Sequence, residues 1–121
     1  FTCTQQKTYI IKKEKELLNM KNVYDGSVII RVTANGCGLP LYGAKLYIDG
    51  KVFTIPSESH GFSERIKIFQ SDRKGISCFI SARAECNGFE SLTCNKIPVT
   101  SGYITLWNMP LEPKVRQSQI F

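Results

Sequence analysis

The chain has 121 residues, of which 42% are hydrophobic and 21% are charged, and its net charge is +6. This length suits a single domain, and the balance of hydrophobic and charged residues excludes an intrinsically disordered chain. No apolar run approaches the roughly 18 residues that a membrane-spanning helix needs, so we expect no membrane span.

The positive charge is spread along the chain rather than gathered in one segment. Residues 1–25, 26–60, 61–95 and 96–121 carry net charges of +2, +1, +1 and +2. Nucleic-acid binding typically uses clustered Lys and Arg with stacking aromatic side chains, so we expect no nucleic-acid partner. A basic polyanion-binding domain is one alternative function.

The first 25 residues differ in pattern from the rest of the chain. Residues 8–11 (TYII) suit a strand, and residues 12–20 (KKEKELLNM) suit a short helix or a loop with a small apolar face. We interpret residues 1–25 as an N-terminal arm.

From Gly26 onward the hydrophobic residues recur with a period of two, which is typical of half-buried strands. The Asp49-Gly50 and Asn87-Gly88 pairs each predict a two-residue hairpin turn, because both central positions of a type I′ turn need a positive φ. The predicted strands are residues 27–34, 44–48, 51–54, 62–69, 76–86, 89–97 and 102–108.

About seven short strands with regularly spaced turns and no long helix predict an all-β fold. We expect a single antiparallel β-sandwich, transthyretin-like or immunoglobulin-like, over residues 26–112. Residues 113–121 then form a C-terminal tail or an edge strand.

Cysteine content points to a compartment. None of the five cysteines forms a CxxC pair and the chain has one His, so we expect no zinc site, no other metal and no cofactor. Five cysteines in a domain of this size are typical of secreted or cell-surface proteins. We expect two disulfides and one odd thiol among Cys3, Cys37, Cys78, Cys86 and Cys94. The odd thiol either stays free or joins two chains.

The second hairpin turn restricts how these cysteines pair. A two-residue turn sets Cys86 opposite Phe89 and Ser81 opposite Cys94. Residues directly opposite share a face of the sheet, so Cys94 is expected to face away from Cys78.

Three of the cysteines therefore lack a partner within the hairpin. Cys94 cannot reach Cys78 or Cys86 in this register without a bulge, and those two lie too far apart along one strand. We expect at least one bridge to tie Cys3 of the arm, or Cys37 of the glycine-rich loop, to the sheet.

Several short motifs occur in an order that is characteristic of one family. Residues 26–32 (GSVIIRV) are followed by residues 39–50 (LPLYGAKLYIDG), Gly61-Phe62, residues 84–89 (AECNGF) and residues 103–111 (YITLWNMPL). These stretches resemble the carboxypeptidase regulatory-like, or transthyretin-like (prealbumin-type), sandwich domains. The longer turn at residues 54–61, the cysteines and the arm depart from that pattern. The resemblance implies a sandwich that serves as an accessory, spacer, adhesin or pilus-type module.

The best candidate for catalysis is His60, which follows Ser57, Glu58 and Ser59. Residues so close together on one loop rarely form a catalytic triad, and no glycine motif for an oxyanion hole accompanies them. We therefore interpret His60 as an exposed turn residue and predict that the chain is not an enzyme.

The predicted binding surface is a group of aromatic side chains on strand faces that also carry charges. Aromatic residues beside Arg are typical anchors of interfaces. We expect a protein or a glycan to bind at Tyr47, Phe79, Arg83 and Phe89, whereas Trp107 is assigned to the core.

The leading predicted function is a non-catalytic, secreted or surface-exposed module that binds or spaces. Residues 1–11 and 115–121 (VRQSQIF) also suit strands that add to the sheet of a neighbouring subunit. The first alternative is therefore a subunit of an adhesin, a pilus or another extracellular assembly. Either terminus can instead form a strand or a tail of its own domain, and this argues against the assembly alternative.

Overall fold

The computed structural model describes residues 23–114, and within them it contains seven strands and no helix. The predicted arm up to residue 22 and the tail from residue 115 lie outside the described residues. The strands are β1 (Tyr24–Ala34), β2 (Lys45–Ile48), β3 (Lys51–Thr54), β4 (Ile66–Ser71), β5 (Ser77–Glu85), β6 (Leu92–Thr100) and β7 (Ile104–Leu111).

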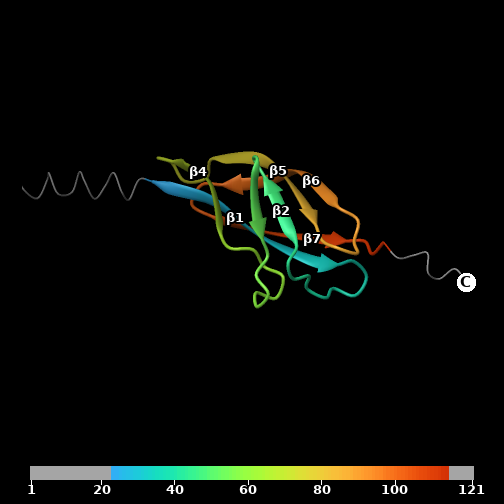
Figure 1. The fold of residues 1–121 in the computed structure, drawn as a ribbon. Coiled ribbons are helices and arrows are strands. Elements are labelled where there is room, and N and C mark those ends of the chain that lie inside the picture. Colours follow the sequence, from blue (N-terminus) through green and yellow to red (C-terminus); the bar gives the residue numbers. More distant parts are fainter. Residues whose placement is uncertain (1–22, 115–121) are drawn as a thin grey trace, which may run out of the picture.

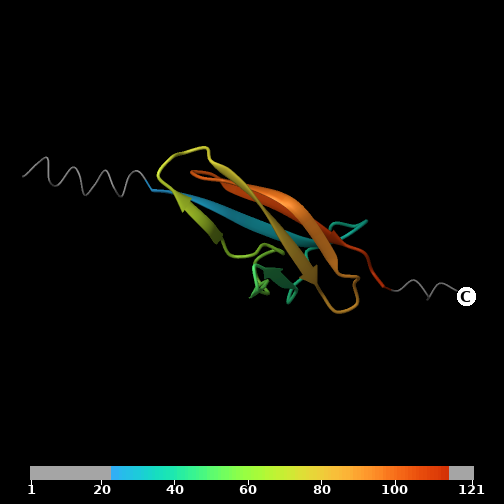
Figure 2. The same ribbon diagram turned by 90° about the horizontal axis from the view of Figure 1, so that it is seen from above.

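The strands form two sheets that pack face to face (Figures 1 and 2). One sheet has the order β4-β1-β7 and the other has the order β3-β2-β5-β6. The prediction of an all-β sandwich of about seven strands is confirmed. β4 begins later than predicted, at Ile66, and Phe62 makes only an isolated bridge to Arg31.

One strand pair departs from the antiparallel arrangement that the sequence predicted. β1 and β7 pair in parallel, in continuous register from Ser27 opposite Ile104 to Ala34 opposite Leu111. The first and last strands of the sandwich therefore run side by side in the same direction. Figure 1 shows the consequence, since β1 (blue) begins at one end of the molecule and β7 (red) leaves at the other.

The core lies between the two sheets and follows from the period-two pattern. Val28, Ile30 and Val32 of β1 are fully buried, as are Met109 and Leu111 of β7. Complete burial of one such aliphatic side chain contributes about 1.5–3 kcal/mol to folding. The other sheet buries Leu46, Ile48, Ile80, Ala82, Ala84, Ile97 and Val99 against them.

The two predicted hairpin turns differ in conformation. Asp49 and Gly50 both have a positive φ, of 51° and 76°, which confirms the type I′ turn between β2 and β3. At the second turn only Gly88 has a positive φ, of 86°, which is the sign pattern of a type II turn. Type II turns splay the strands that they connect, so the tight hairpin predicted at Asn87-Gly88 does not form.

The splayed turn shifts the register of β5 and β6 by one residue. Beyond the turn the chain pairs with the C-terminal segment instead, because the N–H of Glu90 donates to the carbonyl of Glu112 at 2.7 Å. As a result Ala82, rather than Ser81, lies opposite Cys94. A bulge follows at Lys96, whose φ is 62°.

Candidate functional site

The outward face of the four-stranded sheet carries three of the four predicted contact residues. Tyr47 of β2 lies directly opposite Arg83 of β5, and Phe79 lies four residues before Arg83 on the same strand. All three side chains point away from the core, because they alternate with buried neighbours along their strands. We call the outward side of β2, β3, β5 and β6 the B face.

An aromatic–cation pair lies near the middle of the B face. The guanidinium carbon of Arg83 lies 4.4 Å from the centroid of the Tyr47 ring. Arg83 also pairs with the carboxylate of Glu85, two residues farther along β5. The cation is therefore held by a ring on one strand and a carboxylate on its own strand.

Phe79 is the most exposed aromatic side chain of the B face. It is 66% exposed and lies opposite Pro98 of β6. Hydroxyl and amide groups surround it, since Ser77 shares a 2.7 Å hydrogen bond with Thr100 and Ser81 donates to Asn95 at 2.8 Å. An apolar anchor set among polar groups is typical of a recognition surface.

Phe89 does not belong to the B face, which corrects the prediction that grouped it with Tyr47 and Phe79. It is half-buried, packs against the core and bridges to Pro113. The splayed turn causes this, because it sends residues 88–90 toward the C-terminal segment. Phe89 and Tyr47 nevertheless both line one open hollow of about 420 Å³.

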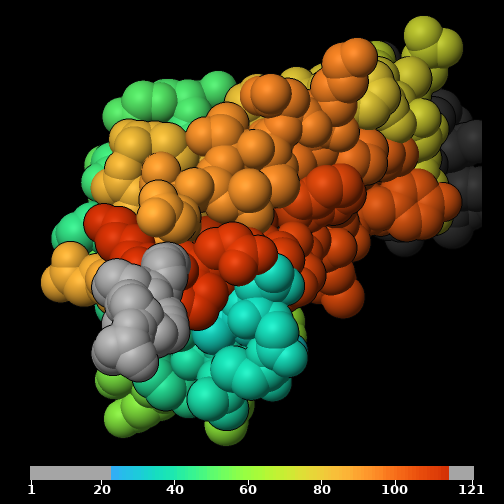
Figure 3. All heavy atoms as spheres, turned by 90° about the vertical axis from the view of Figure 1, so that its right-hand side faces the viewer, coloured from blue at the N-terminus to red at the C-terminus, as the bar shows by residue number. Residues whose placement is uncertain are grey.

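That hollow lies beside the turn between β5 and β6, and most of its lining is polar. Lys45, Glu85, Asn87 and Glu90 contribute charged or amide groups to its wall. Figure 3 shows this end of the sandwich, where the end of β7 (red) lies between residues 35–43 (teal) and the β5–β6 region (orange). The B face and the hollow together offer aromatic, cationic, anionic and amide groups to a ligand.

The cysteines form no disulfide among the described residues, so the prediction of two internal bridges is wrong. Cys37, Cys78, Cys86 and Cys94 are free thiols, and Cys3 lies outside the described residues. The register shift turns Cys94 toward the core, the side that it shares with Cys78 and Cys86, which corrects the expectation that it faces away from them.

Spacing explains why the three sheet cysteines do not pair. Cys94 lies opposite Ala82, four residues from Cys78 and four from Cys86. Four residues span about 13 Å along a strand, which exceeds the reach of a disulfide. Cys37 lies in the exposed loop after β1, so no bridge ties this loop to the sheet. Burial raises the pKa of the Cys86 thiol above its ordinary value, against the opposing effect of a backbone hydrogen bond at Asn87.

His60 lies in an exposed turn with a φ of 56°, as expected for a turn residue. Its carbonyl accepts a 2.9 Å hydrogen bond from Nε of Arg31. The neighbouring Ser59 hydroxyl donates to the carbonyl of Pro56 at 3.0 Å. Both groups therefore serve the structure of the loop.

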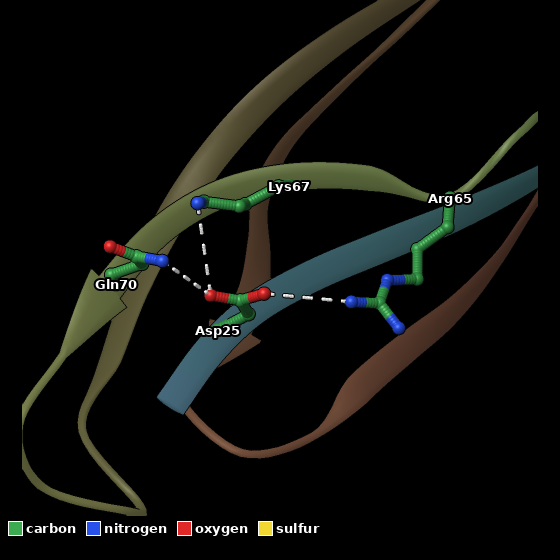
Figure 4. A network of polar contacts seen from close by, with 4 residues as sticks. All are labelled: Asp25, Arg65, Lys67 and Gln70. Atoms are coloured by element: carbon green, nitrogen blue, oxygen red, sulfur yellow. Dashed lines mark hydrogen bonds and ion pairs between the residues drawn. The ribbon is translucent and has the colours of Figure 1, made fainter. Parts of the chain in front are cut away.

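A small polar network lies where β1 enters the sandwich (Figure 4). Asp25 accepts a 3.0 Å hydrogen bond from Gln70 of β4 and lies within 4 Å of two cations, Arg65 and Lys67. The side chains of both cations are about half exposed, so the pairs add little to stability. The position of β1 beside β4 is set by their antiparallel backbone pairing, and the network lies next to that pairing.

An apolar patch that was not predicted lies on the outward side of the three-stranded sheet, and we call it the A patch. It consists of Ile104 and Leu106 of β7, and Leu106 is 69% exposed. The alternation in residues 103–109 contains the signal, because an inward Trp107 implies an outward Leu106. The expectation for Trp107 is confirmed, since it packs against the core.

Within residues 23–114 no group of three or more His, Cys, Asp or Glu side chains is placed to hold a metal ion. No helix in this part of the chain is long and apolar enough to cross a membrane. Comparison with known proteins returns neither a matching family model nor a matching curated protein. The resemblance to transthyretin-like domains therefore stays a prediction.

Proposed function

We propose that this chain is a non-catalytic module that binds a partner and spaces other parts of an assembly. The partner is a protein or a glycan, and the place of action is the cell surface or the extracellular medium. The proposed location is supported by the count of five cysteines and by the resemblance to transthyretin-like domains. It is not supported by a disulfide, since the described residues contain none.

The observation that carries the binding proposal is the grouping of Tyr47, Phe79 and Arg83 on the B face. Phe79 offers an exposed apolar anchor and the Tyr47–Arg83 pair offers a fixed cation beside an aromatic ring. Tyr and Arg dominate the energetics of many interfaces because they combine apolar area with a polar end. The hollow beside Tyr47 adds carboxylate and amide groups that suit the hydroxyls of a sugar or the backbone of a peptide.

The proposal that the chain is not an enzyme is supported by the placement of its single His. His60 lies on an exposed loop, and its neighbour Ser59 donates its hydroxyl to Pro56 rather than to the imidazole. A nucleophile needs a base within hydrogen-bond reach.

The test of binding is an array of glycans and of secreted and cell-surface proteins, probed with the full chain. We expect Phe79→Ser and Tyr47→Ser to abolish the signal of a true ligand. Leu106→Ser is the matched control, because Leu106 is as exposed as Phe79 but lies on the opposite side of the sandwich. Binding that survives both B-face variants, or an array without any ligand, contradicts the proposal.

The test of location is fractionation of cells that produce the protein. We expect the chain in the medium or on a surface that added protease reaches. Retention of all of it inside intact cells contradicts the proposed location and leaves the B-face proposal in place.

The second candidate function is a subunit of an extracellular assembly, and the A patch favours it. Exposed apolar patches of this kind often mark surfaces that meet another protein. Sedimentation of the full chain over a range of concentrations tests this function. Oligomers that dissociate in the Leu106→Ser variant support this function. A chain that stays monomeric at every concentration contradicts it.

A further inference from the structure

We propose that the sandwich is a load-bearing element in which the parallel pairing of β1 and β7 resists tension applied along the chain. The inference rests on the spacing role proposed above and gives that role a mechanical basis. Tension enters the described domain at the start of β1 and leaves it after the end of β7, and these two points lie at opposite ends of the molecule (Figures 1 and 2).

The direction of the strands decides how the hydrogen bonds between them are loaded. Because β1 and β7 are parallel neighbours, pulling on Val23 and Lys114 draws them past each other along their length. Hydrogen bonds across a parallel strand pair are evenly spaced along the pair and slanted between the two strands, so none of them lies along that direction. They are therefore sheared together, whereas a hairpin pulled at its open end breaks one pair at a time.

The length of the pairing sets how many bonds share the load. The register is continuous over eight pairs, from Ser27–Ile104 to Ala34–Leu111. Backbone bonds extend it at both ends, since the N–H of Ser27 lies 3.4 Å from the carbonyl of Tyr103 and that of Asn35 lies 2.8 Å from the carbonyl of Leu111. The whole shared length of the two strands thus opposes sliding.

Each end of the pairing is also fastened to a neighbouring segment. Where β1 enters, the N–H of Gly102 donates to the carbonyl of Asp25 at 2.8 Å. Where β7 leaves, the N–H of Lys114 donates to the carbonyl of Gly88 at 2.9 Å, beside the bond from Glu90 to Glu112. These contacts keep the strand ends from peeling before the paired region is loaded.

Packing adds to the resistance. Val28, Ile30 and Val32 of β1 and Met109 and Leu111 of β7 are all fully buried in the same core. A slip of one residue turns these side chains to the opposite face of the sheet, and a slip of two pulls them out of their packing sites. Sliding therefore breaks the bonds and disrupts the core in the same step.

The experiment compares two pulling directions on the same full-length protein with a single-molecule force instrument. In the first, handles at the two ends of the chain shear β1 against β7. In the second, one handle stays at the N-terminal end and the other is attached at Asp72, next to the pair Tyr24–Ser71, so that antiparallel β1 and β4 unzip. We expect a rupture force several-fold higher in the first direction. Equal forces in the two directions overturn the inference.

Two matched variants locate the resistance. Met109→Ala lies in the β1–β7 pair and Leu46→Ala lies in β2, and both residues are fully buried. We expect both to lower the thermal midpoint, with the larger loss of end-to-end rupture force in Met109→Ala. An equal loss of force in Leu46→Ala assigns the resistance to the core as a whole and contradicts the inference. Ligand binding by the B face is measured without force, so failure of either proposal is distinguishable from failure of the other.

Discussion

Arg83 of β5 lies over the ring of Tyr47 of β2, and the two residues are direct cross-strand partners in the four-stranded sheet. The pair exists because β2 and β5 pair in a register that sets Leu46 opposite Ala84, and both of these neighbours are fully buried in the core. Side chains alternate along each strand, so Tyr47 and Arg83 then meet on the outward face.

The energy of this pair is measurable by a double-mutant cycle. Exposed cation–π contacts contribute about 0.5–1 kcal/mol, so we expect a coupling of that size between Tyr47→Leu and Arg83→Met in urea unfolding. Thr93 also lies opposite Arg83 but on the far side of it from Tyr47. A control cycle of Tyr47→Leu with Thr93→Ala should give no coupling. A coupling near zero in the first cycle would show that the contact contributes nothing.

The effect of a substitution on stability should depend on which side of the three-stranded sheet the substituted side chain faces. Ile30 is fully buried in β1, whereas Leu106 is exposed on β7 of the same sheet. We expect Ile30→Ala to lower the free energy of unfolding by about 2–5 kcal/mol, because it leaves a cavity. Leu106→Ala should change it by less than about 0.5 kcal/mol. Urea titration monitored by tryptophan fluorescence measures both, and equal effects contradict the assigned core.

The strands and the first turn were predictable because their signals are local. Alternation at Val28, Ile30 and Val32 marks a strand with one buried side, and the structure buries all three. Asp49-Gly50 predicts its turn because both positions tolerate a positive φ. Tyr47 and Arg83 fall on one face for the same local reason, since side chains alternate along each strand.

The errors arose where a distant segment decides the local structure. Asn87-Gly88 has the sequence of a type I′ turn, but residues after it pair with Glu112 and Pro113, more than 20 positions away. No local pattern contains that contact, so the position of Cys94 and of Phe89 could not be predicted. The parallel pairing of β1 with β7 could not be predicted for the same reason, because it joins strands from opposite ends of the domain's sequence.

The free cysteines should label at different rates. Cys37 is exposed in the loop after β1, whereas Cys78, Cys86 and Cys94 are only partly accessible. We expect a maleimide to label Cys37 first in the native protein, and all four described cysteines to label in urea without reductant. Mass spectrometry of the digested protein assigns each label to its cysteine. Fewer than four labels among these residues in urea means that a disulfide involving one of them exists.

Stability should fall in the alkaline range, and Cys86 should contribute to the fall. Burial raises the pKa of its thiol in the folded state, so folding favours the neutral form. That contribution is complete below the thiol pKa of the unfolded chain and is lost as the pH rises through the higher folded pKa. Urea unfolding across this range should show a shallower decline for Cys86→Ala than for wild type. A decline in Cys86→Ala as steep as that in wild type would contradict the assignment to this thiol.

The loop between β3 and β4 should be sensitive to one methyl group at Gly61. Its φ is 86°, and an added Cβ would lie 2.7 Å from the carbonyl oxygen of Val32, which accepts a hydrogen bond from Leu41. Gly36 has a φ of 99° but open space around it. The Gly36→Ala variant therefore measures the cost of the backbone conformation without any collision. We expect Gly36→Ala to cost about 1–2 kcal/mol and Gly61→Ala more than about 3 kcal/mol, because the second variant adds a collision with a strand that cannot move.

Thermal unfolding of both variants and of wild type measures this difference. Because Gly61 touches β1, the loss should appear as a lower midpoint for the whole domain rather than as a separate early transition. Equal midpoints for the two variants would mean that the backbone of β1 shifts at Val32 and makes room for the added methyl group. In that case the loop is not fixed against the central strand, and the paired β1–β7 region is less rigid than the packing implies.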